Sequence, residues 1–289
     1  MAAINHLTQK TKTLILGVVS LVLAYIMICF MFYMNQEAMI FIGANDNPDF
    51  EQFWQGRHQT ASINEQKLEY WHIKNPEQPP GWLIYFGGNA ENVVYNLPMF
   101  DQLAVANVVA VNYRGYGNSS GEPSEKDLLA DALGLYDHLA KKFPSEFHHI
   151  RVMGRSLGTS VAAYVAANRQ VAGAILVSPF DGLNNVAKSH FPWLPVTWLL
   201  KHRFEVHRYI ENKKLPNLLM ITGDSDRVIP NIFSESLFQQ WQGAKSRVKL
   251  PGNHNTLTQS LGYYPSINNY VAIPPNQLDP QSEIKHANL

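Results

Sequence analysis

The stretch IRVMGRSLGTSVAAYVAANR, residues 150–169, decides the fold. Residues 150–154 form an apolar run with the length of a buried strand, and the Ala-rich residues 157–169 are typical of a helix. Between them lies GRSLG at 154–158, which leaves no room for a longer connection. A strand that passes directly into a helix must turn sharply, and glycines on both sides of the turn permit close packing. We therefore predict an α/β architecture around this turn.

On both sides of this stretch, apolar runs of strand length alternate with helical patterns. Strands are predicted at 68–74, 82–86, 107–113, 173–180, 215–223 and 246–252, and helices at 91–104, 124–143 and 231–242. Apolar residues follow one another in the central strands rather than alternating with polar ones, which indicates a mostly parallel sheet with helices on both faces. Ligands of open α/β sheets bind beyond the carboxyl ends of the strands, so we expect the functional side chains in those loops.

A second feature is the segment TLILGVVSLVLAYIMICFMFY, residues 13–33, which contains neither a charged residue nor a proline. About 20 such residues cross the hydrocarbon core of a bilayer as a helix. A cleaved signal peptide normally has a shorter apolar stretch and a small-residue cleavage site, and none precedes Gly43. Ile28 stands before Cys29, where a lipoprotein signal needs a small residue, and a buried soluble helix is rarely apolar on every face. We predict an uncleaved transmembrane anchor.

The flanks of this segment predict its orientation. Lys10 and Lys12 precede it, whereas the charged residues that follow are acidic. The positive-inside rule then places the N-terminus in the cytoplasm and the large C-terminal domain outside it, in the periplasm if the protein is bacterial. The predicted organisation is a cytoplasmic N-terminus at 1–12, an anchor at 13–33, a juxtamembrane segment at 34–60, an α/β domain at 61–273 with a small insertion at 181–214, and a tail at 274–289.

Composition excludes several classes of function. Lys plus Arg and Asp plus Glu number 23 each, so no excess of positive charge attracts nucleic acid. Cys29 is the single cysteine, which rules out a disulfide framework. No pair of histidines has the spacing of metal ligands, so we predict no metal and no cofactor.

The pattern G-x-S-x-G occurs twice, at 117–121 and at 154–158. A nucleophilic serine on this pattern needs a strand before it and a helix directly after it. Ser119 follows a Gly-rich loop, and Glu122-Pro123 delays any helix, so it is interpreted as a loop residue. Ser156 meets both conditions and is the candidate nucleophile, with a helix N-cap as its alternative role.

A serine hydroxyl needs a base and a group that orients the base, expected in the order Ser, Asp, His. The strand 215–223 runs into Asp224 and Asp226, and either could equally form a turn. Asp226 is preferred because the next helix would start directly after it. Of the 11 histidines, His254 follows the last strand in a loop that Gly252 allows to turn tightly. The predicted triad is Ser156, Asp226 and His254.

Two backbone amides are candidates for an oxyanion hole. The segment FGGNA at 86–90 follows a buried strand, and its glycines let an N–H group approach a developing negative charge. We assign one donor to Asn89 and the second to Leu157, directly after the nucleophile. A turn that initiates a helix is the alternative for 86–90.

Six segments together resemble the membrane-anchored branch of the α/β-hydrolases. They are YFGGNAEN, NYRGYGNSSGEPSE, GRSLGTS, SPFDG, ITGDSDRVIP and GNHN, in the expected order within about residues 65–272. That branch includes protein depalmitoylases, lysophospholipid lipases and many uncharacterised bacterial hydrolases. The resemblance implies the α/β-hydrolase fold and supports the roles assigned to Ser156, Asp226, His254, Leu157 and Asn89. In one departure, Gly87-Gly88 replaces a His-Gly pair that is frequent in the family.

The expected activity is hydrolysis of ester or thioester bonds through an acyl-enzyme intermediate. The membrane segment favours small-molecule or lipid-like acyl substrates. Aromatic residues of the insertion, among them Phe191, Trp193 and Trp198, are candidates to line an acyl pocket, and packing on the sheet is the alternative. Two other functions remain open. One is a non-catalytic scaffold of the same fold, and the other is an aminopeptidase, which would need an acidic group for the substrate amine.

Overall fold

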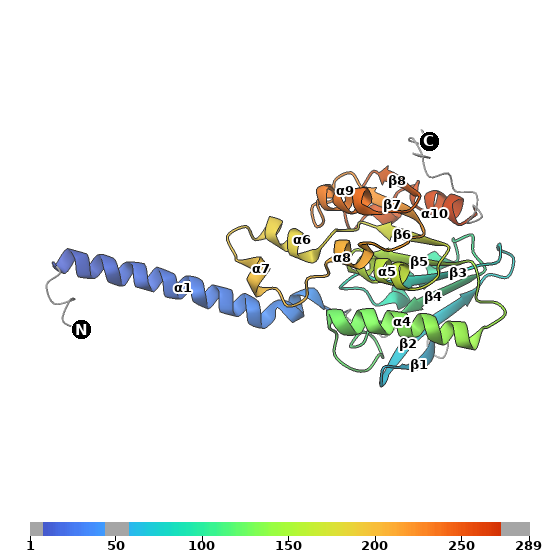
Figure 1. Cartoon of the computed structure of the whole chain (residues 1–289), viewed down its shortest axis with the longest axis horizontal. Coiled ribbons are helices and arrows are strands. Elements are labelled where there is room, and N and C mark those ends of the chain that lie inside the picture. Colours follow the sequence, from blue (N-terminus) through green and yellow to red (C-terminus); the bar gives the residue numbers. More distant parts are fainter. Residues whose placement is uncertain (1–7, 44–57, 273–289) are drawn as a thin grey trace.

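The computed structural model describes residues 8–43 and 58–272, and a single eight-stranded sheet forms its centre (Figure 1). The strand order is β1-β2-β4-β3-β5-β6-β7-β8. The strands are β1 His58–Ile63, β2 Gln66–Lys74, β3 Trp82–Phe86, β4 Asn107–Val111, β5 Ile150–Arg155, β6 Gly173–Val177, β7 Asn217–Gly223 and β8 Lys245–Leu250. Strand β2 pairs antiparallel with β1 and with β4, and the other five pairings of this sheet are parallel. The predicted α/β class with a mostly parallel sheet is confirmed.

Helices cover both faces of the sheet. They are α1 Gln9–Ile40, η2 Val93–Asn96, α3 Leu97–Phe100, α4 Glu125–Lys142, α5 Leu157–Asn168, α6 Leu183–His190, α7 Val196–Leu199, α8 Val206–Ile210, α9 Asn231–Gln240, η3 Leu257–Gln259 and α10 Tyr263–Ala272. One core joins the sheet to α4, α5, α8 and α9, and a second joins it to η2, α3 and α10. Successive residues of β3 enter different cores, since Ile84 belongs to the first and Tyr85 to the second. A strand buried on both sides must be apolar throughout, as the sequence of β3 is.

The register of the parallel strands aligns their carboxyl ends at one edge. Phe86 of β3 lies opposite both Val111 of β4 and Gly154 of β5. Gly223 of β7 lies opposite Leu250 of β8. Each predicted site residue follows β3, β5, β7 or β8, so the fold delivers all of them to the edge where ligands of such sheets bind.

The predicted helix at 91–104 is wrong. The structure has a 3-10 turn, η2, followed by the four-residue helix α3. Asn92 accepts a hydrogen bond from the Val94 amide, and the Val93 amide donates to Asn112 Oδ1. Side-chain bonds of this kind compete with helical ones. Pro98 cannot donate a backbone hydrogen bond, so it is tolerated only in the first turn of the short helix α3.

Strand β1 and helix α10 were not predicted. The strands β1 and β2 form a hairpin whose turn residues, Asn64 and Glu65, both have positive φ values of 47° and 64°. Such a turn normally contains Asn-Gly or Asp-Gly. Because Glu65 stands where glycine is usual, the sequence does not indicate a hairpin here. The first residues of β1 were assigned to the juxtamembrane segment 34–60.

Helix α1 projects from the domain (Figure 1). Within the described residues it is the one helix that is long and apolar enough to cross a membrane, judged by length and composition, with a mean hydropathy of 2.8 over its most apolar window. At 32 residues it extends beyond the predicted anchor 13–33 on both sides. Residues 1–7 and 44–57 and the predicted tail 274–289 lie outside the described residues.

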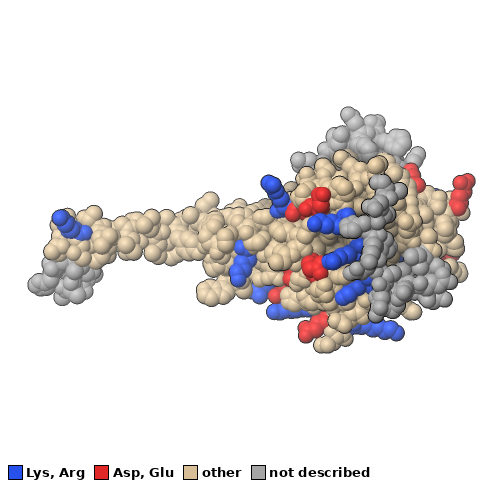
Figure 2. All heavy atoms as spheres, turned by 90° about the horizontal axis from the view of Figure 1, so that it is seen from above, with Lys and Arg blue, Asp and Glu red and all other residues tan. Residues whose placement is uncertain are grey.

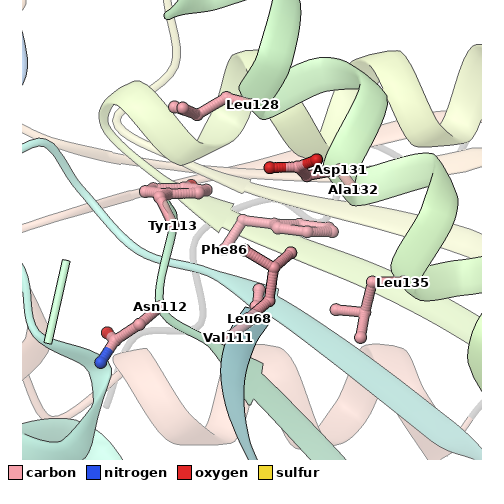
Figure 3. Close-up of a pocket in the computed structure, with 9 residues that line it drawn as sticks. All are labelled: Leu68, Phe86, Val111, Asn112, Tyr113, Leu128, Asp131, Ala132 and Leu135. Atoms are coloured by element: carbon pink, nitrogen blue, oxygen red, sulfur yellow. The ribbon is translucent and has the colours of Figure 1, made fainter. Parts of the chain in front are cut away.

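A small void lies between α4 and the sheet (Figure 3). Its volume of about 10 Å³ holds at most one water molecule. The lining residues are Leu68, Phe86, Val111, Asn112, Tyr113, Leu128, Asp131, Ala132 and Leu135. No predicted site residue is among them, so this void reflects the packing of α4 and is no substrate pocket.

A buried ion pair fixes α4 to the loop after β4. The Arg114 guanidinium donates two hydrogen bonds of 2.7 Å to the Asp131 carboxylate, and both residues are buried. The hydrogen bond from Arg114 to Asp131 raises the pKa of the guanidinium. Removing one partner of such a pair leaves an uncompensated charge in the interior.

We predict that Asp131→Asn lowers the free energy of unfolding by about 3 kcal/mol, because Arg114 loses its buried counter-charge and keeps only the partly exposed Asp127 at 3.4 Å. Chemical denaturation of the full chain in a mild detergent measures this loss. Asp137→Asn on the same helix is the matched control, since Asp137 pairs with Arg169 while its side chain is 57% exposed. It should cost less than about 1 kcal/mol. Equal losses in the two variants would contradict the prediction.

Candidate active site

Ser156 stands in a strained turn between β5 and α5. Its φ of 53° and ψ of −120° are rare for a residue with a side chain, and such strain is concentrated at functional sites. The Ser156 amide donates to the carbonyl of Val177 at 2.9 Å, which fixes the turn to the neighbouring strand β6. Its side chain makes no capping hydrogen bond to α5. The hydroxyl is therefore available for another partner.

The glycines on either side of Ser156 are required by contact distances. A Cβ atom on Gly154 would lie 2.1 Å from the carbonyl oxygen of Gly158. A Cβ atom on Gly158 would lie 2.1 Å from the carbonyl oxygen of Phe86 at the end of β3. Backbone atoms cannot retreat from such overlaps as a flexible side chain can. This stretch of G-x-S-x-G thus allows α5 to start against the ends of β3 and β5.

Three side chains from separate loops meet at this turn. His254 Nε2 lies 3.0 Å from Ser156 Oγ, and His254 Nδ1 lies 2.8 Å from Asp226 Oδ2. All three residues are buried, each with 8% of its surface exposed. The structure therefore brings together Ser156, His254 and Asp226, which were assigned from the sequence.

The backbone orients the Asp226 carboxylate. Its Oδ1 accepts hydrogen bonds from the amides of Val228 and Ile229 at 3.0 and 2.8 Å, which leaves Oδ2 for His254. Burial raises the pKa of Asp226, but the hydrogen bonds from His254 and from the Ile229 amide outweigh burial and bring the pKa below its ordinary value. The group is accordingly an ionised carboxylate at neutral pH.

The ionisation of Asp226 determines the direction of both hydrogen bonds. A carboxylate only accepts, so Nδ1 of His254 carries the proton and donates to Oδ2. In the neutral imidazole, Nε2 is then an acceptor, and the Ser156 hydroxyl donates to it. This arrangement can withdraw a proton from Ser156.

The loop that carries His254 turns at Gly252, whose φ is 136°. The Asp224 carboxylate accepts a hydrogen bond from the Gly252 amide at 3.1 Å and is exposed. Asn253 closes the loop by accepting from the amides of Asn255 and Thr256. Asp224 therefore joins the two loops, while Asp226 contacts the imidazole.

Glu91 and Arg155 form a polar bridge that the sequence analysis missed. Arg155 donates to Glu91 Oε2 at 3.3 Å and to the carbonyl of His254 at 2.9 Å. Glu91 also accepts from the Gly88 amide and from the Tyr85 hydroxyl, at 2.9 and 2.6 Å. Burial lowers the pKa of Arg155, but the Glu91 carboxylate raises it above its usual value, so the guanidinium stays charged. Glu91 lies in the motif YFGGNAEN and Arg155 in GRSLGTS. Their positions in these motifs were the only indication in the sequence that they belong to the site.

The loop after β3 lies against the Ser156 turn. A Cβ atom on Gly88 would be 3.6 Å from Cβ of Ser156. Tyr113 donates to the carbonyl of Gly87 at 2.9 Å, and Tyr116 donates to that of Asn89 at 2.7 Å. Together with the Glu91 bond to Gly88, these contacts fix the loop that contains Gly87-Gly88.

The second G-x-S-x-G match has a structural explanation. Ser119 donates to the carbonyl of Asn112 and accepts from the amide of Glu69, both at 2.9 Å. Its hydroxyl thus links two backbone segments. Within residues 8–43 and 58–272, no group of three or more His, Cys, Asp or Glu side chains is arranged to hold a metal ion.

Comparisons with known proteins agree with this geometry. The sequence model described as serine aminopeptidase, S33, matches residues 78–217. Membrane protein YNL320W of Saccharomyces cerevisiae is 31% identical over 219 residues, which cover 71% of this chain and 75% of that protein. Protein Rv2307c of Mycobacterium tuberculosis is 37% identical over 161 residues, covering 53% of this chain. The match spans 57% of the length of the mycobacterial relative.

Among solved structures, esterase Est1E from Butyrivibrio proteoclasticus, with ferulic acid bound, has the same fold. The TM-score is 0.59 at 18% identity, and the alignment covers 74% of this chain and 98% of the esterase chain. This likeness confirms the α/β-hydrolase fold that was expected from the sequence motifs.

The lowered pKa of Asp226 predicts how stability depends on pH. A carboxyl whose pKa is lower in the folded state stabilises the fold above its ordinary pKa of 3.8, and loses this contribution as the pH falls through the folded value. The difference in unfolding free energy between the wild type and Asp226→Asn should therefore be constant near neutral pH and shrink in acid. Denaturant titrations at a series of pH values measure it. A difference that grows on acidification would contradict this prediction.

Proposed function

The chain belongs to the α/β-hydrolase family, and from that premise we propose that it is a serine hydrolase that cleaves ester or thioester bonds, with Ser156 as the nucleophile. The observation that carries this proposal is the chain of contacts from Ser156 Oγ to His254 and on to Asp226, at 3.0 and 2.8 Å. A serine in a strained turn with an imidazole oriented by a carboxylate is the arrangement that acyl transfer requires.

In the first half of the reaction, Ser156 Oγ attacks the carbonyl carbon while its proton passes to Nε2 of His254. Asp226 stabilises the imidazolium that forms. The tetrahedral intermediate collapses, the bond to the alcohol or thiol breaks, and the leaving group takes the proton from Nε2. The acyl group is then esterified to Ser156.

In the second half, a water molecule gives a proton to His254 and its oxygen attacks the acyl carbon. The bond to Ser156 breaks, its oxygen recovers the proton from Nε2, and the carboxylic acid departs. His254 and Asp226 return to the state seen in the structure.

We assign the stabilisation of both tetrahedral intermediates to the amides of Leu157 and Asn89. Leu157 is the first residue of α5, so its N–H group has no acceptor within the helix. Asn89 follows Gly88, which lies against Ser156, and the Tyr116 hydroxyl holds the Asn89 carbonyl. One such donor contributes about 3 kcal/mol to the transition state.

Esters and thioesters are favoured over peptides with a free amino terminus. An aminopeptidase needs an unpaired carboxylate to bind the substrate amine, and Glu91 is the acidic residue that contacts the loop beside Ser156. Its oxygens already accept from Arg155, Gly88 and Tyr85. A carboxylate that is neutralised in this way offers little attraction to an ammonium group.

We further propose that α1 is a single-pass anchor, with the N-terminus in the cytoplasm and the catalytic domain outside it. Support comes from the apolar length of α1, from Lys10 and Lys12 in its first turn, and from the yeast relative described as a membrane protein. An anchored hydrolase is suited to lipid-like acyl substrates.

Labelling with a fluorophosphonate probe tests the nucleophile. Ser156→Ala should abolish labelling, since the probe reacts only with an activated serine. Ser119→Ala is the matched control, because it removes the serine of the other G-x-S-x-G match, and the variant should still be labelled. Persistent labelling of Ser156→Ala would overturn the assignment, and no labelling of the folded wild type would favour a non-catalytic scaffold.

A substrate panel separates acyl hydrolysis from aminopeptidase activity. We expect kcat/KM for p-nitrophenyl and thioester substrates to exceed that for amino-acid anilides by at least about a hundredfold, because Glu91, the carboxylate beside the Ser156 turn, is already paired. Ser156→Ala gives the background rate. If Glu91→Gln selectively abolished a substantial anilide activity, Glu91 would be an amine-binding residue and the preference for esters would be wrong.

A further inference from the structure

The insertion between β6 and β7 contains a second uncharged apolar segment. Residues 191–200 read FPWLPVTWLL, and Lys188 with His190 precede them and Lys201 follows. The segment includes α7 and the loop that joins it to α6. It is too short to cross a bilayer, for which about 20 residues are needed.

This segment lies along α1 (Figure 1). The Tyr25 hydroxyl donates to the carbonyl of Trp193 at 2.8 Å. The ring of Phe32 is 5.3 Å from that of Phe191 and 6.0 Å from that of Trp193. Phe191 and Trp193, which were expected to line an acyl pocket, thus contact the apolar helix.

A polar boundary marks the other end of the contact. Gln36 donates to the carbonyl of Leu199 at 3.0 Å and accepts from the amide of Lys201 at 2.7 Å. The Lys201 ammonium is 3.1 Å from Glu37 and lies over the ring of Tyr33 at 4.8 Å. A lysine beside a tyrosine is typical of the membrane–water interface.

The contact with Tyr25 extends well into the apolar part of α1. Tyr25 lies eight residues before Tyr33 in the helix, which corresponds to about 12 Å along its axis at 1.5 Å per residue. If the segment 13–33 occupies the hydrocarbon core, a chain segment bonded to Tyr25 must enter that core as well.

The two tryptophans of the segment are exposed. Trp198 has 86% of its surface exposed and Trp193 has 51%. The apolar residues of α1 from Leu14 to Met34 are exposed in the same way. Figure 2 shows this as an uncharged surface along α1, between the positive charges at its outer tip and the charged surface of the domain. Apolar surface that is continuous with a membrane helix is suited to lipid.

We propose that residues 191–200 form a second membrane-inserted element, which enters the bilayer beside α1 without crossing it and places Trp193 and Trp198 among the lipids. The proposal rests on α1 being the membrane anchor. Its occupant is the bilayer, because the segment continues the surface of that helix and ends at the same polar boundary.

The position of this element also bears on the substrate. His190 Nε2 donates to the carbonyl of Val228 at 2.9 Å, two residues from Asp226. Val228, in the loop of Asp226, and Ile232, in α9, are both exposed apolar residues. The His190 bond therefore joins the insertion to the loop of Asp226, and if the element is inserted, an acyl substrate dissolved in the bilayer would approach the rim of the site from this side.

Depth-dependent quenching tests the insertion. In the full chain with Cys29→Ser, an environment-sensitive fluorophore is attached through Trp198→Cys, and the protein is reconstituted into phosphatidylcholine vesicles with spin-labelled lipid. We expect blue-shifted emission and quenching well above that of an aqueous site, with Leu21→Cys in α1 as the reference for the hydrocarbon core. Glu77→Cys is the aqueous control, since it lies in the turn after β2, at the opposite edge of the sheet from the site.

Each outcome of this experiment is decisive. A label at 198 that behaves as at 77, while the label at 21 is quenched, overturns the insertion and leaves the anchor intact. An unquenched label at 21 removes the anchor and the proposal together. Trp198 is largely exposed, so the substitution leaves the core intact. Fluorophosphonate labelling of the same preparation reports the hydrolase function independently.

A kinetic test addresses the delivery of substrate. Trp198→Ser should leave kcat/KM for soluble p-nitrophenyl acetate unchanged and lower the rate on an ester carried in vesicles by about tenfold, because an interfacial anchor is lost. Leu261→Ser is the matched control, since Leu261 is 91% exposed outside the insertion. An equal effect of Trp198→Ser on both substrates would contradict delivery from the bilayer.

Discussion

The steric constraint at the Ser156 turn organises the rest of the molecule. The residues at 154 and 158 must lack side chains, because a Cβ atom at either would lie 2.1 Å from a backbone carbonyl oxygen. With that clearance, α5 starts against the end of β3, and the loop after β3 comes to rest beside the hydroxyl. The consequence is a serine at φ 53°, held by the hydrogen bond from the Ser156 amide to the carbonyl of Val177 and by the packing of α5. The strained residue is thus the one whose hydroxyl contacts His254.

Arg155 and Glu91 connect the loops that this turn brings together. Arg155 directly precedes Ser156, and its guanidinium donates hydrogen bonds to Glu91 and to the backbone carbonyl of His254. Glu91 in turn accepts a hydrogen bond from the amide of Gly88. One ion pair therefore links the loop of His254 to the loop after β3. Because the pair is partly buried, it is stronger than a surface pair but depends on both partners being present. Its position explains why a loop with two successive glycines is nevertheless held at several points.

The sequence was informative where a single local rule decided the outcome. Buried strands such as β3 are continuously apolar, and the strand–serine–helix pattern predicted the turn at Ser156. The segment 91–104 was misread because Asn92 and Asn112, which are distant in sequence, bond its backbone and override its helical pattern. The β1–β2 hairpin escaped notice because Glu65 occupies a position that usually belongs to glycine. The contact between Tyr25 and Trp193 joins residues 168 positions apart, and no local pattern predicts such a pair.

Helix α1 runs without a break from Gln9 to Ile40, and Gln36 near its end is buried between two backbone groups of the insertion. A continuous helix fixed in this way differs from a flexible linker, since the domain cannot rotate freely about the end of α1. With this helix standing in a bilayer, Ser156 would stay at a constant height above the lipid. Encounters with substrate would then be a two-dimensional search, in which lateral diffusion and the tilt of one helix set the reach of the enzyme.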